Sequence, residues 1–171
     1  MPGSLSHLTR RFFDVLLARP LDPAETTAVE NWLDEGEARL FFSQPEADQR
    51  HGYHAALVVL ASGNLDGTVL KAALLHDVGK RHARLGVMAR SLVSVLIRLR
   101  LPLSARGRKY RDHGEAAARE LGELGCDDLI VDFARHHHER RPPGFPENVW
   151  DLLQRADEPP KTGETLKSRI S

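Results

Sequence analysis

The stretch TVLKAALLHDVGK, residues 68–80, places two ionisable side chains on the apolar faces of a predicted helix. His76 is in helical phase with Val69, and Asp77 continues the neighbouring apolar stripe. Lys71 is almost the only side chain of this helix that would favour exposure to solvent. We therefore expect His76 and Asp77 to be buried or at the floor of a cleft. Burying an imidazole and a carboxylate costs on the order of several kcal/mol unless each is paired or bound to a metal. The stretch therefore predicts a polar centre inside a helical protein.

Other predicted helices also carry polar residues on apolar faces. The residues that follow this pattern are His51, His54, His137 and Asp157. Any one of them taken alone is best interpreted as a hydrogen-bonded core residue. Together, in a chain of this length, they are satisfied most simply by one polyvalent cation that imidazoles and carboxylates surround.

Every element that we predict is a helix. Apolar residues recur at helical spacing, and no stretch alternates with period two. Asp22 followed by Pro23 and Glu25 predicts a helix start, and Gly79 is placed to cap a helix that ends near Asp77. The predicted helices span residues 6–18, 22–40, 45–62, 66–77, 87–101, 113–124, 127–137 and 147–157. The sequence thus predicts an all-α fold.

Length and composition narrow the class of protein. A chain of 171 residues suits one domain, and 41% hydrophobic with 28% charged residues is a globular composition. The single cysteine, Cys126, excludes an intramolecular disulfide and a cysteine-based zinc site, and it is more typical of a small buried residue than of a nucleophile. No apolar run approaches the ~20 residues that span a bilayer, and no signal-peptide core is present. We expect a cytoplasmic protein.

The charge is balanced overall but unevenly distributed. The chain has 24 basic and 24 acidic residues, yet residues 80–111 contain ten bases and no acid. Such a block predicts an anionic partner, namely a phosphate ester, a nucleic acid or a membrane surface, and the alternative is a solvated basic helix face. Nucleic acid is disfavoured because Tyr110 is the only aromatic residue in the block. Residues 87–103 are basic and amphipathic, so they either contact a membrane peripherally or, as we favour, cover a cleft.

The order of the histidines and aspartates resembles that of the HD-domain metal-dependent phosphohydrolases. In chain order the matching motifs are DQRH ending at His51, ALLHDVGK with His76 and Asp77, DHGE with His113, HHHE over residues 136–139, and RADE with Asp157. The resemblance covers residues 45–160, which would form the HD domain. Residues 1–44 would be an N-terminal helical extension, and residues 161–171 a C-terminal tail. The implied fold is a bundle of at least five helices around a metal site.

The resemblance also implies a set of metal ligands for one or two divalent transition-metal ions. By position, these ligands are His51, His76, Asp77 and Asp157 for the first ion and His113, His137 and His138 for the second, with Asp77 placed to bridge both. Imidazole and carboxylate ligands suit iron, manganese, nickel, cobalt or zinc.

Three positions near these ligands stay open at the level of sequence. His54 could replace His51, since both lie on one helix, although the motif favours His51. The HHE unit selects His137 and His138 and leaves His136 as an exposed or supporting residue. Asp48 lies on the same helical face as His51, so it either orients that imidazole or belongs to a solvated face.

The activity implied by the resemblance is hydrolysis of a phosphomonoester or phosphodiester, in a nucleotide or another small phosphate ester, by metal-activated water. Asp77 would accept the proton of the water, and Lys80 would neutralise phosphate charge. Further substrate-binding cations are expected among Arg81, Arg84, Arg108 and Lys109. The alternative function is a non-catalytic metal or nucleotide sensor that keeps the ligands without turnover.

Overall fold

The computed structural model describes residues 19–158 of the chain. Over this range the chain forms nine α-helices and one 3-10 helix and has no strand, so the predicted all-α fold class is confirmed. The predicted helix over residues 6–18 and the predicted tail over residues 161–171 lie outside the described residues. No helix in the described range is long and apolar enough to cross a membrane.

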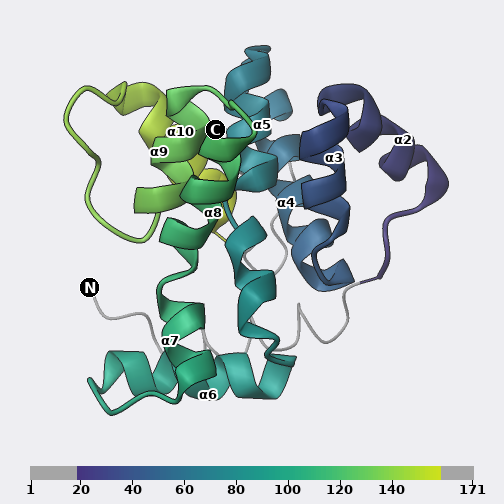
Figure 1. Ribbon diagram of the computed structural model, residues 1–171. Coiled ribbons are helices and arrows are strands. Elements are labelled where there is room, and N and C mark those ends of the chain that lie inside the picture. The colour runs from purple at the N-terminus through teal and green to yellow at the C-terminus, as the bar shows by residue number, and fades with distance from the viewer. Residues whose placement is uncertain (1–18, 159–171) are drawn as a thin grey trace.

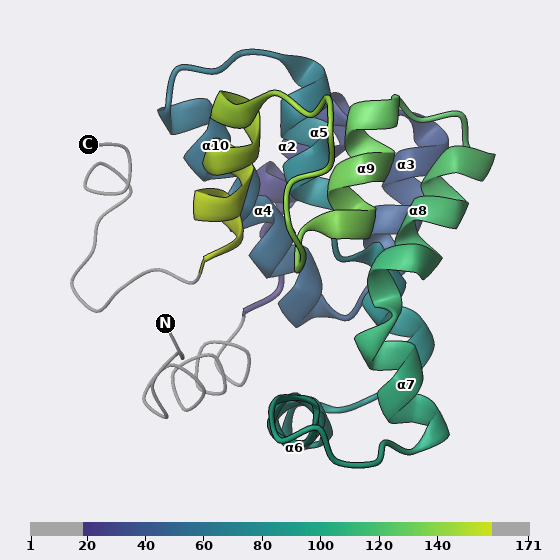
Figure 2. The same cartoon turned by 90° about the vertical axis from the view of Figure 1, so that its left-hand side faces the viewer.

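Most of the helices follow one another through short connections, and the longest connection runs from α9 to α10 (Figure 1). Their bounds are α2 Pro23–Trp32, α3 Glu35–Phe42, α4 Glu46–Ala61, α5 Gly67–Leu75, the 3-10 helix η1 Val78–Ala83, α6 Val87–Arg98, α7 Ala105–Arg111, α8 His113–Glu123, α9 Asp128–His136 and α10 Glu147–Asp157. Helix α5 lies inside the bundle, where it contacts α4, α9 and α10, while α8 packs on α9 and η1. Helices α6 and α7 project from one end of this bundle (Figure 2).

The core forms where small residues let helices approach closely. Helix α5 is buried along most of its length, including Ala72 and Ala73. A Cβ atom on Gly52 of α4 would lie 2.8 Å from the backbone oxygen of Leu74 on α5, so only glycine permits this contact. The close packing of α4 on α5 brings the residue before Gly52, which is His51, next to the carboxyl end of α5.

Three sequence predictions about individual helices were wrong. The helix predicted over residues 22–40 is two helices, because Asp34 caps a new one through a reciprocal capping box with Glu37. The helix predicted to reach Asp77 ends at Leu75, and Gly79 lies inside η1 instead of capping α5. Helix α7 was not predicted, although the hydroxyl of Ser104 caps it by accepting a hydrogen bond from the backbone N–H of Gly107.

Candidate metal centre

The carboxyl end of α5 delivers His76 and Asp77 to the interior of the bundle. Both residues are buried, and His76 is the C-cap of the helix. The Nδ1 atom of His76 donates a hydrogen bond to the backbone oxygen of Ala73 at 2.9 Å. Its other ring nitrogen, Nε2, lies 3.1 Å from Oδ1 of Asp157 and 3.4 Å from Oδ2 of Asp77. Both carboxylates therefore meet one imidazole.

We call His51, His76, Asp77 and Asp157 the first group. It joins α4, the end of α5 and the last residue of α10, since Nε2 of His51 lies 2.9 Å from Oδ1 of Asp157 and 3.7 Å from Oδ2 of Asp77. Each member offers one ligand atom, and these four atoms lie within 4.8 Å of one another. Residues far apart in sequence therefore converge on a volume suited to one ion.

We call Asp77, His113, His137 and His138 the second group. The Nε2 atoms of His113 and His137 lie 3.2 and 3.4 Å from Oδ1 of Asp77, and 3.3 Å from each other. The ligand atoms of all four members again lie within 4.8 Å of one another. Asp77 belongs to both groups, and it directs Oδ2 to the first and Oδ1 to the second.

The backbone fixes which ring nitrogen of three histidines faces the centre. The Nδ1 atoms of His76, His113 and His137 each donate to a backbone oxygen three residues earlier, at 2.9, 2.7 and 2.9 Å. Because a carbonyl oxygen only accepts, Nδ1 carries a proton and neutral rings point the lone pair of Nε2 inward. This orientation suits a metal ligand, because a backbone carbonyl holds the outer nitrogen. A ring that also carries a proton on Nε2, as His76 does beside its two carboxylates, must release that proton before it binds a metal.

The second group needs a proton or a cation between its members. The Nε2 atoms of His113 and His137 face each other at 3.3 Å, while the Nδ1 atom of each ring already donates to the backbone. The Oδ1 atom of Asp77 is buried among them and has no hydrogen-bond partner of normal geometry in the described structure. A buried carboxylate oxygen without a partner is costly. The residues present therefore fit a metal ion, which would accept electron pairs from all of these atoms.

The electrostatics of the first group favour charged side chains. Burial alone would lower the pKa of His76, but Asp77 and Asp157 outweigh it and raise that pKa to about 10. Burial likewise opposes ionisation of the two carboxyls. The pKa of Asp77 is nevertheless held well below its usual range by Lys80 and His76, and that of Asp157 by His51 and His76. Both aspartates are thus ionised, as ligands must be.

Two histidines of the second group, His137 and His138, behave in the opposite way. Burial lowers the pKa of His137 and outweighs the attraction of Asp77. His138 reaches solvent, yet desolvation and the nearby His137 and Lys80 lower its pKa as well. Neutral imidazoles at this position leave their lone pairs available to a cation.

Lys80 lies one turn beyond the doublet, on η1. Its side chain is buried, and Nζ makes an ion pair and hydrogen bond with Oδ2 of Asp77. The ammonium group therefore reaches the same carboxylate that joins the two groups. It supplies a positive charge at the centre and helps to keep Asp77 ionised.

We find no contact between the other predicted substrate-binding cations and a member of either group. Arg81 pairs with Glu120 at 2.9 Å, and its guanidinium also donates to the backbone oxygen of Val78. Arg84, Arg108 and Lys109 are exposed. No ligand atom of these cations lies in either group, and their part in substrate binding stays a prediction.

The structure distinguishes the alternatives that the sequence left open. His51 joins the first group, whereas His54 is exposed and lies in neither group. His137 and His138 join the second group, whereas His136 pairs with Glu139 at 3.1 Å.

Asp48 follows neither of the two expectations that we had for it. The residue is buried, so it does not belong to a solvated helix face. Its Oδ1 atom pairs with the Arg90 guanidinium of α6 at 2.6 Å and is not seen to contact the ring of His51. Asp48 therefore anchors α6 to α4.

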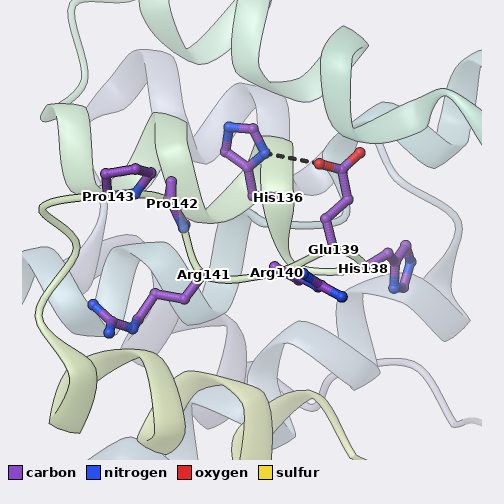
Figure 3. A pocket seen from close by; sticks show the side chains of 7 residues that line it. All are labelled: His136, His138, Glu139, Arg140, Arg141, Pro142 and Pro143. Carbon is purple, nitrogen blue, oxygen red and sulfur yellow. Dashed lines mark hydrogen bonds and ion pairs between the residues drawn. The ribbon is translucent and has the colours of Figure 1, made fainter.

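A surface pocket opens beside the second group (Figure 3). It has a volume of about 780 Å³ and is lined by His136, His138, Glu139, Arg140, Arg141, Pro142 and Pro143. His138 belongs to both the pocket and the second group, so the two are adjacent. Sequence reasoning missed the two arginines, although ERRPP directly after the histidine run could have indicated them.

Comparison of the chain with protein-family models, with curated proteins and with solved structures found no match. The described residues therefore define an all-α protein with buried histidine and aspartate groups that could hold a metal ion.

Proposed function

We propose that this chain is a metal-dependent phosphohydrolase, which cleaves a phosphomonoester or phosphodiester of a nucleotide or another small phosphate ester. One observation carries the proposal: the two oxygens of Asp77 face two separate sets of ligand atoms, with Oδ2 toward His51 and His76 and Oδ1 toward His113 and His137. A carboxylate shared in this way is suited to bridging two ions. The ordered motifs that resemble those of HD-domain phosphohydrolases support the same function.

The ligands suit a hydrolytic metal. The first group offers two imidazoles and two carboxylates, and the second offers three imidazoles and the shared carboxylate, a nitrogen and oxygen set typical of iron, manganese, nickel, cobalt or zinc. When bound, a divalent ion lowers the pKa of water and polarises a phosphoryl oxygen.

The chain itself supplies a proton acceptor and a positive charge. Asp77 is ionised and has an oxygen without a hydrogen-bond partner, so it is placed to accept a proton from the attacking water. Lys80 holds the other oxygen of Asp77 and adds a buried positive charge that offsets the growing negative charge on a phosphoryl group. Both roles depend on residues that the backbone of η1 fixes beside α5.

The pocket beside His138 is the route by which we expect a phosphate ester to approach. Arg140 and Arg141 lie along it, and a guanidinium matches the geometry of phosphate oxygens (Figure 3). Arg141 is held in place because it donates to the backbone oxygen of Phe145 at 2.7 Å. Substrate selection would then depend on these two arginines more than on the block over residues 80–111.

The metal content of the purified chain tests the proposal first. Mass spectrometry is applied to protein prepared without a chelator or a histidine tag, as wild type, Asp77→Ala and the control Asp151→Ala, whose aspartate is exposed on α10. We expect near-stoichiometric transition metal in wild type and the control, and its loss in Asp77→Ala. No metal in wild type, even after incubation with manganese, iron, nickel, cobalt or zinc, would contradict the proposal.

Turnover separates an enzyme from a sensor. Protein loaded with each metal is assayed on p-nitrophenyl phosphate, on bis(p-nitrophenyl) phosphate and on nucleotides. We expect hydrolysis that EDTA and Asp77→Ala abolish and that Asp151→Ala leaves unchanged. Stoichiometric metal without hydrolysis of any ester would replace the enzyme by the non-catalytic sensor.

A further inference from the structure

Helices α6 and α7 with their connection, residues 87–111, form a projection that we call the basic hairpin. Its α6 helix packs mainly on α7 and lies apart from α8, α9 and α10 (Figure 2). The Arg90–Asp48 ion pair joins it to α4 at 2.6 Å. One face of α6 is thus attached to the protein, and Val93 on that face is buried.

The opposite face of α6 presents an apolar stripe to solvent. Met88, Leu92 and Leu99 are 69%, 60% and 61% exposed, and helical spacing puts them on one side of α6 with Val95 between the two leucines. Leu101 follows at 47% exposure. Together with the isolated Leu65 and Leu124, these are the exposed large hydrophobic residues of the described chain. Four of these six residues lie between Met88 and Leu101, on α6 and the segment that follows it, which marks an interaction surface.

The same hairpin carries a strong positive charge. Besides Arg111, its exposed cations are Arg98, Arg100, Arg106, Arg108 and Lys109. We find no ion pair for any of them with the residues that the structure describes, whereas Arg90 pairs with Asp48 and Arg111 with Asp112. No acidic residue occurs over residues 80–111 to neutralise them.

We propose that the basic hairpin docks the protein on an anionic membrane surface. An exposed aliphatic stripe flanked by arginines fits the boundary between lipid head groups and acyl chains, where leucines enter the acyl region and arginines meet lipid phosphates. Each cation near an anionic bilayer adds to this attraction. A second copy of the chain fits less well, because pairing two stripes would bring two sets of cations together. A nucleic acid would leave the aliphatic stripe without a partner.

Co-sedimentation of the full chain with vesicles tests this docking. The vesicles contain either phosphatidylcholine alone or phosphatidylcholine with roughly 30% phosphatidylserine, at low and high sodium chloride. We expect binding to the anionic vesicles only, with most of it lost at high salt. The proposal does not depend on the phosphohydrolase activity, because vesicle binding needs neither metal nor turnover.

Two variants and one control assign the binding to the hairpin. Leu92→Asn with Leu99→Asn removes the apolar stripe, and we expect at least a tenfold loss of vesicle affinity. Arg98→Gln with Arg100→Gln keeps the stripe, and we expect weaker binding with a reduced salt dependence. Leu65→Asn is the control, since Leu65 is 84% exposed in the α4–α5 connection, and it should bind as wild type does. All three variants change exposed residues, so thermal unfolding should stay at the wild-type temperature.

Three outcomes would overturn the proposal. The first is no binding to either kind of vesicle, and the second is equal binding to neutral and anionic vesicles. The third is a dimer in light scattering that the Leu92→Asn and Leu99→Asn changes dissociate, which would assign the stripe to a second copy of the chain.

Discussion

In the first group, His51 and His76 direct their Nε2 atoms to one oxygen of Asp157, at 2.9 and 3.1 Å. In the second group, His113 and His137 direct theirs to each other and to an oxygen of Asp77 that accepts no hydrogen bond of normal geometry. The first arrangement is a hydrogen-bonded network of opposite charges. The second arrangement brings the Nε2 atoms of two imidazoles and a carboxylate oxygen together. These hydrogen-bond acceptors are stable next to one another only if a cation or a proton lies between them.

The directions of the pKa shifts follow the same division. Carboxylates raise the pKa of His76 in the first group, whereas burial lowers that of His137 in the second. Two sites built from the same residue types therefore differ because one has a second carboxylate, Asp157, and the other has a third imidazole. The first group therefore also stabilises the folded, metal-free protein, whereas the second group could hold a cation.

The largest effect is expected at Gly79, where η1 packs closely against α8. A Cβ atom on Gly79 would lie 2.1 Å from the backbone oxygen of His113 and 2.8 Å from the backbone nitrogen of Ala117. Gly79→Ala must therefore separate η1 from α8 and move Asp77 away from His113. We expect the free energy of unfolding, measured with urea, to fall by about 4 kcal/mol.

Gly67→Ala provides the matched control for that change. Gly67 begins α5, and a Cβ atom there would meet nothing within 4 Å. We expect its free energy of unfolding to stay within about 1 kcal/mol of wild type. Equal stability of the two variants would show that η1 and α8 do not need this close contact.

The next largest effect is the difference in stability between a variant of the first group and a variant of the second, both measured in metal-free protein. Asp157→Asn removes the charge that both His51 and His76 contact, so we expect the free energy of unfolding to fall by about 3 kcal/mol. His113→Leu removes an imidazole from the second group, and with it the hydrogen bond from Nδ1 to the backbone oxygen of Tyr110 and the Nε2 contacts with His137 and Asp77. We expect a loss of no more than about 1 kcal/mol. The free energies of unfolding are measured with urea in the presence of EDTA. Equal losses in the two variants would show that the first group does not stabilise the metal-free protein more than the second.

The number of metal ions that each variant binds tests whether the two groups are separate sites. His137→Ala and Asp157→Ala each alter one group, whereas Asp77→Ala alters both. For wild type that binds about two ions, we expect about one ion in each of the first two variants and none in the third. Isothermal titration with manganese or zinc measures this. Loss of both ions from His137→Ala would show that the two groups act as one site.

Much of the fold could be predicted from local sequence signals, and the errors have local causes. Asp22 and Glu25 form the capping box where the sequence indicated a helix start. The same signal recurs at Asp34 and Glu37, but the apolar residues on both sides favoured one continuous helix. Helix α7 was missed because Pro102 and Gly107 are typical of loops, and the cap at Ser104 is a weak signal by itself.

The candidate site was predictable in its members and not in its geometry. Apolar phase marked His51, His76 and Asp157 as interior residues, and the structure has all three buried or half-buried, whereas the same signal was wrong for His54, which is exposed. Their convergence depends on contacts between helices far apart in sequence, such as the close approach at Gly52, and only the resemblance to a family indicated it. Similarly, no local pattern shows that Asp77 gives one oxygen to each group, because that follows from the end of α5 at Leu75.

The smallest effect concerns a carboxylate outside both groups. Glu37 accepts hydrogen bonds from the Lys71 ammonium and from the backbone of Asp34, both at 2.8 Å, and the Cys126 sulfur lies 3.6 Å away. Burial and then Glu37 raise the pKa of the Cys126 thiol to about 11. At pH 8 about 0.1% of it is thiolate, so alkylation by iodoacetamide should be slow and should accelerate about tenfold per pH unit up to pH 10.

Because Glu37 already has its partners, a metal that binds the two groups should leave this thiol unchanged. We expect the same alkylation rate with and without stoichiometric zinc, and a faster rate in Glu37→Gln, which removes the negative charge beside the sulfur. A rate that zinc lowers would place the ion at Cys126 and Glu37. It would show that Glu37, which already accepts hydrogen bonds, competes with Oδ1 of Asp77 for the metal. That result would contradict the distinction between satisfied and unsatisfied carboxylates.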